Sequence, residues 1–372
     1  MLLKNAEAFI DGAFRRVDIR VLDGRIAEIK ESLSGEPAID LAGRKLLPGL
    51  IDIHTHGCVG YDFSDATASQ MQEMTRFYAR HGITSILATT MTMPFESHLK
   101  AMQTVRQVMS APIQGSRILG INMEGPFLGT DKKGAHDPQY LTPINFEQFA
   151  ALDEASGGNI RIVDIDPTLD HAVEFVQKYA GEKVISLAHT SCTYATAKLA
   201  IEAGANHVTH LFNAMNSLHH REPGLIGAVS DFEIYAEIIS DGIHVHPVVI
   251  RMMFKLAGKK MVLISDSMRA AGLEDGLYEL GGQKVYVKNK MATLADGTIA
   301  GSTTTVYEAM RNAVSFGVPL EDAVLSATEV PARSIQKEKS VGVLCVGAYA
   351  DLLVLEQDLS IAAVYVNGQK QI

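Results

Sequence analysis

The sequence predicts an α/β fold, a (β/α)₈ barrel of the TIM type with a small β-sandwich domain formed by both chain ends. Two observations predict it. Between about residues 50 and 267, eight short apolar runs alternate with segments of helical periodicity. Strands that alternate with helices form a parallel sheet, and eight such units favour a closed barrel over an open sheet. Both ends of the chain instead have the pattern of short strands joined by turns.

The eight apolar runs are the candidate barrel strands. In chain order they are GLIDIHTH, ITSILATT, ILGINMEG, IRIVDIDP, VISLAHTS, HVTHLFNA, IYAEIISDG and MVLISDS. Amphipathic stretches at 66–82 and 192–204 predict helices between them, and the second stretch closes on a glycine that suits a helix C-terminus. No glycine-rich GxGxxG follows the first run, which disfavours a dinucleotide-binding sheet.

The two ends carry signals for tight turns between short strands. The turn-forming pairs are Asp11-Gly12, Asp23-Gly24 and Asn367-Gly368. We therefore expect residues 1–48 and 336–372 to pair into one small β-domain, with residues 49–335 forming the barrel. A further segment at 277–302 also has the pattern of strands and turns, and it is inserted within the barrel.

Composition limits the classes of partner. The 372-residue chain has 33 Lys and Arg against 43 Asp and Glu, a formal charge of −10, which argues against non-specific nucleic-acid binding. A small anionic substrate is still allowed, because a local cluster of basic groups can bind one. The three cysteines show no CxxC spacing, and we interpret them as reduced thiols. The N-terminus lacks the unbroken apolar run of a signal peptide, and no stretch approaches the roughly 18–20 apolar residues of a membrane span. We expect a cytoplasmic protein with no membrane partner.

Polar side chains gather where the predicted strands end, and barrel enzymes place their active sites there. These residues are His54 and His56 after the first strand, Glu124 after the third, His189 after the fifth, His210 after the sixth, Asp241 and His244 beyond the seventh, and Asp266 after the eighth. Each one alone has an ordinary explanation, such as a hydrogen-bonded histidine or a capping carboxylate. Together they are the ligand set that suits zinc or iron, so their joint placement predicts a metal site.

The predicted chemistry is hydrolysis at a carbonyl or related centre. A metal at this position would lower the pKa of a bound water from 15.7 to about 7. Asp266, on the last strand, could accept the proton of that water and deliver it to a leaving group. The sequence contains no GxSxG motif and no cysteine in a recognisable nucleophile context, which agrees with a metal-dependent reaction.

The HxH pair with later His, His and Asp residues resembles the amidohydrolase superfamily, although a bare HxH is shared by many hydrolases. Longer motifs narrow the resemblance to the N-acetylglucosamine-6-phosphate deacetylase family. They are MEGPFL, KGAHDP, AHTSCTYA, HLFNAMNSLHHREPGLIGA, DGIHVHP, SDSMRAAG and GTIAGSTTT, in colinear order over nearly the whole chain. EGPF followed some ten residues later by KGAH, with HLFNAM and REPG, is the specific part of this signature.

The resemblance implies a role for each matching position. Glu124, His189 and His210 would bind the main metal, and Asp266 would be the catalytic acid and base. The implied substrate contacts are Ala135 and His136 at the sugar or the amide, Asn213, Ala214 and Arg221 at the phosphate, and Asp241, His244, Ile299, Ala300 and Gly301 around the pocket. Arg221 would reach the neighbouring subunit's site across a homodimer interface.

The histidine pair of the first strand bears on the number of metals. Some members of the resembled family replace this pair and hold a single metal, whereas this sequence keeps His54 and His56. A second metal could then lie beside the first, with Glu124 bridging the two. Alternatively, the pair hydrogen-bonds the nucleophilic water in a one-metal site. Zinc and iron both remain open from the sequence.

The resemblance implies hydrolysis of the acetamide of N-acetyl-D-glucosamine 6-phosphate to D-glucosamine 6-phosphate and acetate, in amino-sugar catabolism. The same reaction on the galacto epimer is the nearest alternative, because the two sugars differ at one hydroxyl. D-aminoacylase, dihydroorotase or adenine-deaminase chemistry is another, although IRIVDIDP has no lysine to bridge two metals as the dihydroorotase type requires. The third alternative is a catalytically silent binding or assembly protein on the same barrel. The presence of every proposed ligand and of Asp266 argues against it, because a silent protein has no physical need for them.

Overall fold

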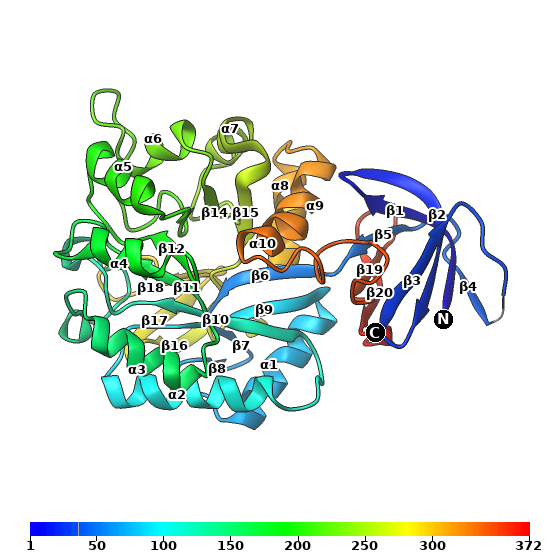
Figure 1. The fold of residues 1–372 in the computed structure, drawn as a ribbon, viewed down its shortest axis with the longest axis horizontal. Coiled ribbons are helices and arrows are strands. Elements are labelled where there is room, and N and C mark those ends of the chain that lie inside the picture. Colours follow the sequence, from blue (N-terminus) through cyan, green and yellow to red (C-terminus); the bar gives the residue numbers. More distant parts are fainter. Residues whose placement is uncertain (36) are drawn as a thin grey trace.

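The computed structural model describes residues 1–35 and 37–372 and contains the eight-stranded parallel barrel that the sequence predicts (Figure 1). Its strands are β6 (Leu50–Thr55), β9 (Ile83–Thr90), β10 (Arg117–Glu124), β11 (Ile160–Ile165), β12 (Val184–Leu187), β13 (His207–Val208), β14 (Tyr235–Ile239) and β15 (Met261–Ile264). They pair in chain order, and nearly every residue in them is buried. Strands covered on both faces need continuous apolar runs, which is why the sequence pattern predicts these strands.

Closure of the barrel joins the first and last strands just beyond the end of β15. Thr55 and Ser267 form a parallel bridge, and the main-chain N–H of Asp266 donates to the His54 carbonyl at 2.9 Å. The main-chain N–H of His56 in turn donates to the Ser267 carbonyl at 2.8 Å. These bonds place Asp266 beside the two histidines, although about 210 residues separate them in the chain.

Ten helices of the described chain cover or flank the barrel. They are α1 (Ala68–Arg80), α2 (Phe95–Met109), α3 (Phe146–Ser156), α4 (Ala172–Tyr179), α5 (Tyr194–Ala203), α6 (Gly224–Asp231), α7 (Pro247–Ala257), α8 (Val306–Ser315), α9 (Leu320–Ala327) and α10 (Glu329–Ser334), with short 3₁₀ turns η1 (Thr130–Lys132), η2 (Pro138–Tyr140) and η3 (Gly258–Lys260). The predicted helices at 66–82 and 192–204 are confirmed as α1 and α5. Thr67 starts α1 with a capping box, and Gly204 ends α5. No helix in the described ranges is long and apolar enough to cross a membrane.

The two chain ends form a separate β-domain, to the right of the barrel in Figure 1. Its strands are β1 (Leu2–Ile10), β2 (Ala13–Leu22), β3 (Arg25–Lys30), β4 (Ala38–Asp40), β5 (Lys45–Pro48), β19 (Leu352–Leu355), β20 (Ile361–Val366) and β21 (Gln369–Lys370), hydrogen-bonded into one continuous sheet. The three predicted turns are confirmed. For example, Asp11 and Gly12 have φ of 51° and 77°, the conformation that Asp-Gly pairs favour between strands. The exact domain boundaries stay a prediction.

This sheet docks on the barrel through alternating side chains. Leu352 and Val354 of β19 pack into the core of the β-domain, whereas Leu353 and Leu355 pack into the core of the barrel. Successive strand residues point to opposite faces, so one short apolar strand contributes to both cores. Each fully buried leucine stabilises the fold by about 2 kcal/mol.

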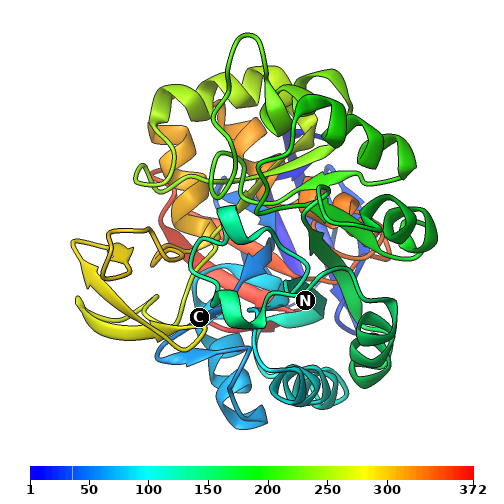
Figure 2. The same ribbon diagram turned by 90° about the vertical axis from the view of Figure 1, so that its left-hand side faces the viewer.

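The predicted insertion is confirmed as a three-stranded antiparallel sheet of β16 (Gly276–Leu280), β17 (Gln283–Lys288) and β18 (Met291–Thr293). In Figure 2 it is the yellow sheet beside the barrel, on the side facing away from the β-domain. A small hairpin of β7 (Gly57–Cys58) and β8 (Tyr61–Asp62) directly follows the first barrel strand.

Candidate metal centre and catalytic pocket

A cavity of about 520 Å³ lies at the C-terminal ends of the barrel strands. Its floor carries seven of the polar residues singled out from the sequence: His56, Glu124, His136, His189, His210, His244 and Asp266. Its walls include loop residues from η1 and from the segment after β18. The strand-end pattern therefore predicted a real meeting point of side chains.

Three of the floor residues sit on bends just beyond their strands. His189, His210 and Asp266 have φ of 45°, 29° and 49°, the left-handed region that residues with a Cβ rarely adopt. Such backbone conformations each cost of the order of 1 kcal/mol or more, and they persist when the surrounding structure holds them. Phe212 and Ala214, which also line the cavity, have positive φ as well.

Glu124, His189 and His210 form a tight triangle of potential ligand atoms. Oε1 of Glu124 lies 3.1 Å from Nε2 of His189 and 3.0 Å from Nε2 of His210, and the two Nε2 atoms are 3.1 Å apart. The three atoms come from β10 and from the ends of β12 and β13. They are close enough together to bind one ion.

The tautomer of His189 decides what this triangle can hold. Its Nδ1–H donates to the Lys132 carbonyl at 2.8 Å, so Nε2 carries a lone pair. Burial lowers the pKa of His189 to about 4, which keeps the ring neutral. That lone pair faces an oxygen of Glu124, so two electron-rich atoms meet without a proton between them. The arrangement fits a divalent cation, with the Lys132 carbonyl orienting the ligand from behind.

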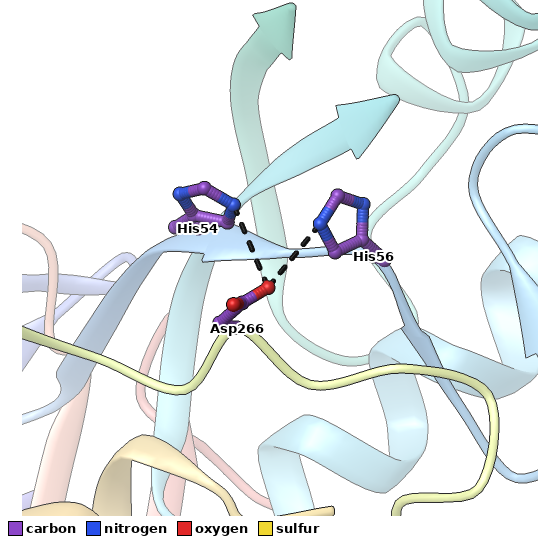
Figure 3. Close-up of side chains that lie close together, drawn as sticks. All are labelled: His54, His56 and Asp266. Atoms are coloured by element: carbon purple, nitrogen blue, oxygen red, sulfur yellow. Dashed lines mark ion pairs between the residues drawn. The ribbon is translucent and has the colours of Figure 1, made fainter. Parts of the chain in front are cut away.

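A second group lies next to the triangle. Nε2 of His54 and Nε2 of His56 lie 3.7 and 3.3 Å from Oδ1 of Asp266, and all three side chains converge on one point (Figure 3). The same two Nε2 atoms are 3.5 and 3.2 Å from the carboxylate oxygens of Glu124. Together these groups could hold a metal ion. Glu124 is shared between the two groups.

Electrostatics in this second group favour a positive ion. Burial lowers the pKa of His54, but the charges of Glu237 and Glu124 outweigh burial and raise that pKa well above its ordinary value. Burial raises the pKa of Asp266, but the hydrogen bond from His56 and the charges of both histidines bring it below its ordinary value. Nε2 of His54 is buried and has no hydrogen-bond partner. A buried polar atom of this kind is expected to have a partner, and a cation would be one.

His136 has the opposite hydrogen-bonding role from His189. The main-chain N–H of Thr92 donates to Nδ1 of His136 at 3.3 Å, and the Thr92 hydroxyl lies 2.8 Å from the same nitrogen. A main-chain N–H can only donate, so Nδ1 is an acceptor and Nε2 carries the hydrogen. Nε2 lies 3.4 Å from Oε2 of Glu124 and faces the cavity. His136 therefore presents a donor to whatever occupies the cavity.

The remaining predicted residues divide into two sets. Asn213, Ala214, Ala135, Ile299 and Gly301 line the cavity, as does His244. Asp241 lies behind His244 and accepts from its Nδ1–H at 2.6 Å, whereas Ala300 is buried outside the lining. Arg221 is exposed, contacts His220, and does not line the cavity of its own chain.

Sequence reasoning missed several residues at this site. Thr92, which contacts His136, and Lys132 of η1 lie outside every quoted motif, and Lys133 begins KGAHDP but was given no role. The two lysines add positive charge to the cavity wall. Asp164 on β11 and Glu237 on β14 are fully buried beneath the floor. The available signal was a carboxylate inside an otherwise apolar buried strand, because an unpaired charge is hardly ever buried.

Comparisons with known proteins agree with this geometry. Residues 46–370 match the Amidohydrolase family. The N-acetylglucosamine-6-phosphate deacetylase of Bacillus subtilis (strain 168) is 36% identical, over 94% of this chain and 91% of that protein. The N-acetylgalactosamine-6-phosphate deacetylase of Escherichia coli O157:H7 is 32% identical, over 94% of this chain and 93% of that protein. The crystal structure of the N-acetylglucosamine-6-phosphate deacetylase from Pasteurella multocida superposes with a TM-score of 0.94 at 30% identity, covering 99% of this chain and 98% of that one.

Proposed function

Because this chain belongs to the amidohydrolase family, we propose that it hydrolyses the acetamide of N-acetyl-D-glucosamine 6-phosphate to D-glucosamine 6-phosphate and acetate. One observation carries the proposal. At the floor of a sugar-sized cavity, beside Asp266, the lone pair of the neutral His189 ring faces an oxygen of the Glu124 carboxylate, with no proton between the two atoms. Amidohydrolases depend on metal ions, and this floor provides the donor groups that bind them.

We assign the ligands from these distances. Glu124, His189 and His210 would hold one zinc or iron ion, and His54 with His56 would hold a second, with Glu124 shared between them. When bound, an ion of this kind activates a water at neutral pH and polarises the carbonyl that is attacked. The two-ion arrangement is supported by donors that lie 3.2–3.7 Å apart in the second group.

Asp266 is the proton carrier in this scheme. Its lowered pKa keeps it ionised near neutral pH, so it can accept a proton from the attacking water. It then delivers that proton to the nitrogen as the carbon–nitrogen bond breaks. His136 donates through Nε2–H to the oxygen of the acetamide carbonyl, where negative charge develops during attack.

Binding of the sugar phosphate falls to the cavity wall. Burial lowers the pKa of His244, but its hydrogen bond to Asp241 and the charges of Asp241 and Asp266 outweigh burial and raise it above its ordinary value. His244 then acts as a charged donor to the substrate. Asn213 and Ala214 would meet the phosphate, and Arg221 would reach the phosphate bound by a neighbouring subunit. A homodimer and a cytoplasmic location remain predictions from the sequence.

The test of this function compares kcat/KM for acetate release from N-acetylglucosamine 6-phosphate and from N-acetylgalactosamine 6-phosphate. The second sugar is included because a relative named for it is 32% identical to this chain. A preference for the gluco epimer supports the proposal, and a preference for the galacto epimer assigns the same chemistry to the other sugar. Acetate release from neither sugar, in protein that contains metal, would reject both substrates.

A further inference from the structure

Glu237 lies in the middle of β14, beneath the candidate metal centre. It is fully buried, and the other four residues of its strand are buried as well. A buried carboxylate is costly unless hydrogen-bond donors compensate for the loss of water. Its partners therefore indicate why it is there.

The partners of Glu237 belong to both groups of the metal centre. Its Oε2 accepts from Nδ1–H of His54 at 2.9 Å and from the main-chain N–H of His210 at 3.2 Å. In addition, the main-chain N–H of Leu211 donates to the Glu237 carbonyl at 2.8 Å. One residue thus joins β6, at the first strand of the barrel, to the turn that carries His210.

The bond to His54 sets the tautomer of that ring. When a metal ion takes the place of the proton on Nε2, the bond to Glu237 keeps the remaining hydrogen on Nδ1, and the Nε2 lone pair faces the space beside Glu124 and Asp266. Within the described chain, Glu237 is the only acceptor within hydrogen-bond reach of this Nδ1 atom. Without it the ring could turn, or carry its hydrogen on the atom that faces the cluster.

The bond to His210 holds a strained bend. His210 has a φ of 29°, and within the described part of the chain its N–H bonds to no acceptor other than Glu237. An orphaned buried N–H and a left-handed bend both favour rearrangement of this turn. Rearrangement would move Nε2 of His210 away from the 3.0 Å position beside Glu124.

We propose that Glu237 is a positioning residue that aligns His54 and His210 for metal binding, so that one carboxylate oxygen couples the two ion positions. The inference rests on the proposed function only insofar as the cluster binds metal, and it holds for any substrate. Carboxylates that orient ligating histidines in this way typically change metal affinity about 10- to 100-fold when they are removed.

The experiment compares zinc binding by wild-type protein and by the E237L and E237Q variants, using equilibrium dialysis with metal analysis. E237L removes the acceptor, and we expect zinc affinity to fall about 10- to 100-fold. E237Q keeps an oxygen that can accept both hydrogens, and its affinity should stay within about threefold of wild type. D351N is the matched control, since Asp351 is a buried carboxylate bonded to Asn367 in the β-domain, and it should not change zinc affinity. If E237L does not fold, as judged by circular dichroism, E237D replaces it, because the shorter side chain withdraws the acceptor while keeping the charge.

A double-mutant cycle with H54A separates positioning from general destabilisation. If Glu237 acts through His54, its removal in the H54A background should cost clearly less zinc affinity than in wild type. Wild-type affinity in folded E237L, or strictly additive effects in the cycle, would overturn the proposal. Wild-type protein that binds zinc but releases no acetate would instead reject the proposed substrate, leaving the comparison of affinities intact.

Discussion

At the scale of single residues, hydrogen bonds from the main chain give identical side chains different chemistry. His189 donates to the Lys132 carbonyl and so turns a lone pair inward, whereas His136 accepts from the N–H of Thr92 and so turns a hydrogen inward. Both rings lie beside Glu124, with their centroids 4.7 Å apart. The first suits a metal ligand, and the second suits a donor to a developing oxyanion.

Asp266→Asn tests the proton-carrier role at this scale. The amide keeps the size of the side chain but cannot accept a proton, so we expect kcat to fall about 10²- to 10⁴-fold. Metal at the Glu124, His189 and His210 triangle should be retained, because Asp266 is not part of it. Steady-state kinetics and metal analysis on one preparation check both statements. A variant with near-wild-type kcat would remove Asp266 from this role.

At the scale of elements, the barrel was predictable because its strands are buried on both faces and therefore appear in the sequence as continuous apolar runs. The turns of the β-domain were predictable for a similar reason, since Asp-Gly and Asn-Gly pairs supply the positive φ that tight hairpins require. The cluster of candidate metal ligands followed from one rule, that polar residues at the ends of barrel strands meet.

Other features of the site could not be predicted, because they depend on pairings between elements. The role of Glu237 appears only once β14 is placed against the ends of β6 and β13, and nothing in IYAEIISDG names a partner. The tautomers of His136 and His189 depend on two main-chain groups, which no residue pattern encodes. Arg221 was predicted by resemblance alone, and the single chain leaves it exposed.

The contact between β9 and α2 makes a prediction about stability and pH. His98 of α2 is buried with its Nε2 3.0 Å from the Thr90 hydroxyl, and burial lowers its pKa from 6.5 to about 4. Between these two pH values the unfolded chain binds a proton at His98 that the folded chain does not. The free energy of unfolding therefore decreases as the pH falls from 6.5 towards 4. The full loss is about 3 kcal/mol.

His98→Gln removes this titration while keeping a polar group near Thr90. The difference in unfolding free energy between wild type and H98Q, measured by urea at several pH values, should be constant above pH 7. It should shift in favour of H98Q by up to about 3 kcal/mol on going to pH 4. Other titrating groups are common to both proteins and cancel in the difference. A difference that stays flat from pH 8 to pH 4 would show that His98 is not held neutral.

At the scale of the whole molecule, the β-domain formed by the two chain ends lies at one end of the barrel, where β5 leads into the start of β6 (Figure 1). The cavity lies at the other end, where the barrel strands finish. Strand β5 leads almost directly into β6, so the β-domain and the first histidine pair belong to one continuous stretch of chain. Across the join, the ring of Tyr349 lies between two guanidinium groups, 3.8 Å from Arg117 and 4.2 Å from Arg25. Arg117 begins the strand that ends in Glu124, so the β-domain contacts the strand that carries a proposed metal ligand.

The exposed position of Arg221 makes a prediction about assembly. If this side chain binds the phosphate in a neighbouring subunit, Arg221→Ala should raise KM for the phosphorylated sugar about tenfold or more with little change in kcat. Hydrolysis of the unphosphorylated sugar should be unaffected. Sedimentation of the wild-type protein should show a dimer. An equal loss with both sugars, or a monomeric wild type with full activity, would mean that Arg221 is not the phosphate clamp.

The most direct measurement of the central claim is acetate release from N-acetylglucosamine 6-phosphate by chelator-treated protein, as zinc or iron is returned in known amounts. We predict that activity is lost on chelation and recovers until one or two equivalents per chain are bound. Full activity in protein shown to be free of metal would contradict the metal-dependent deacetylase.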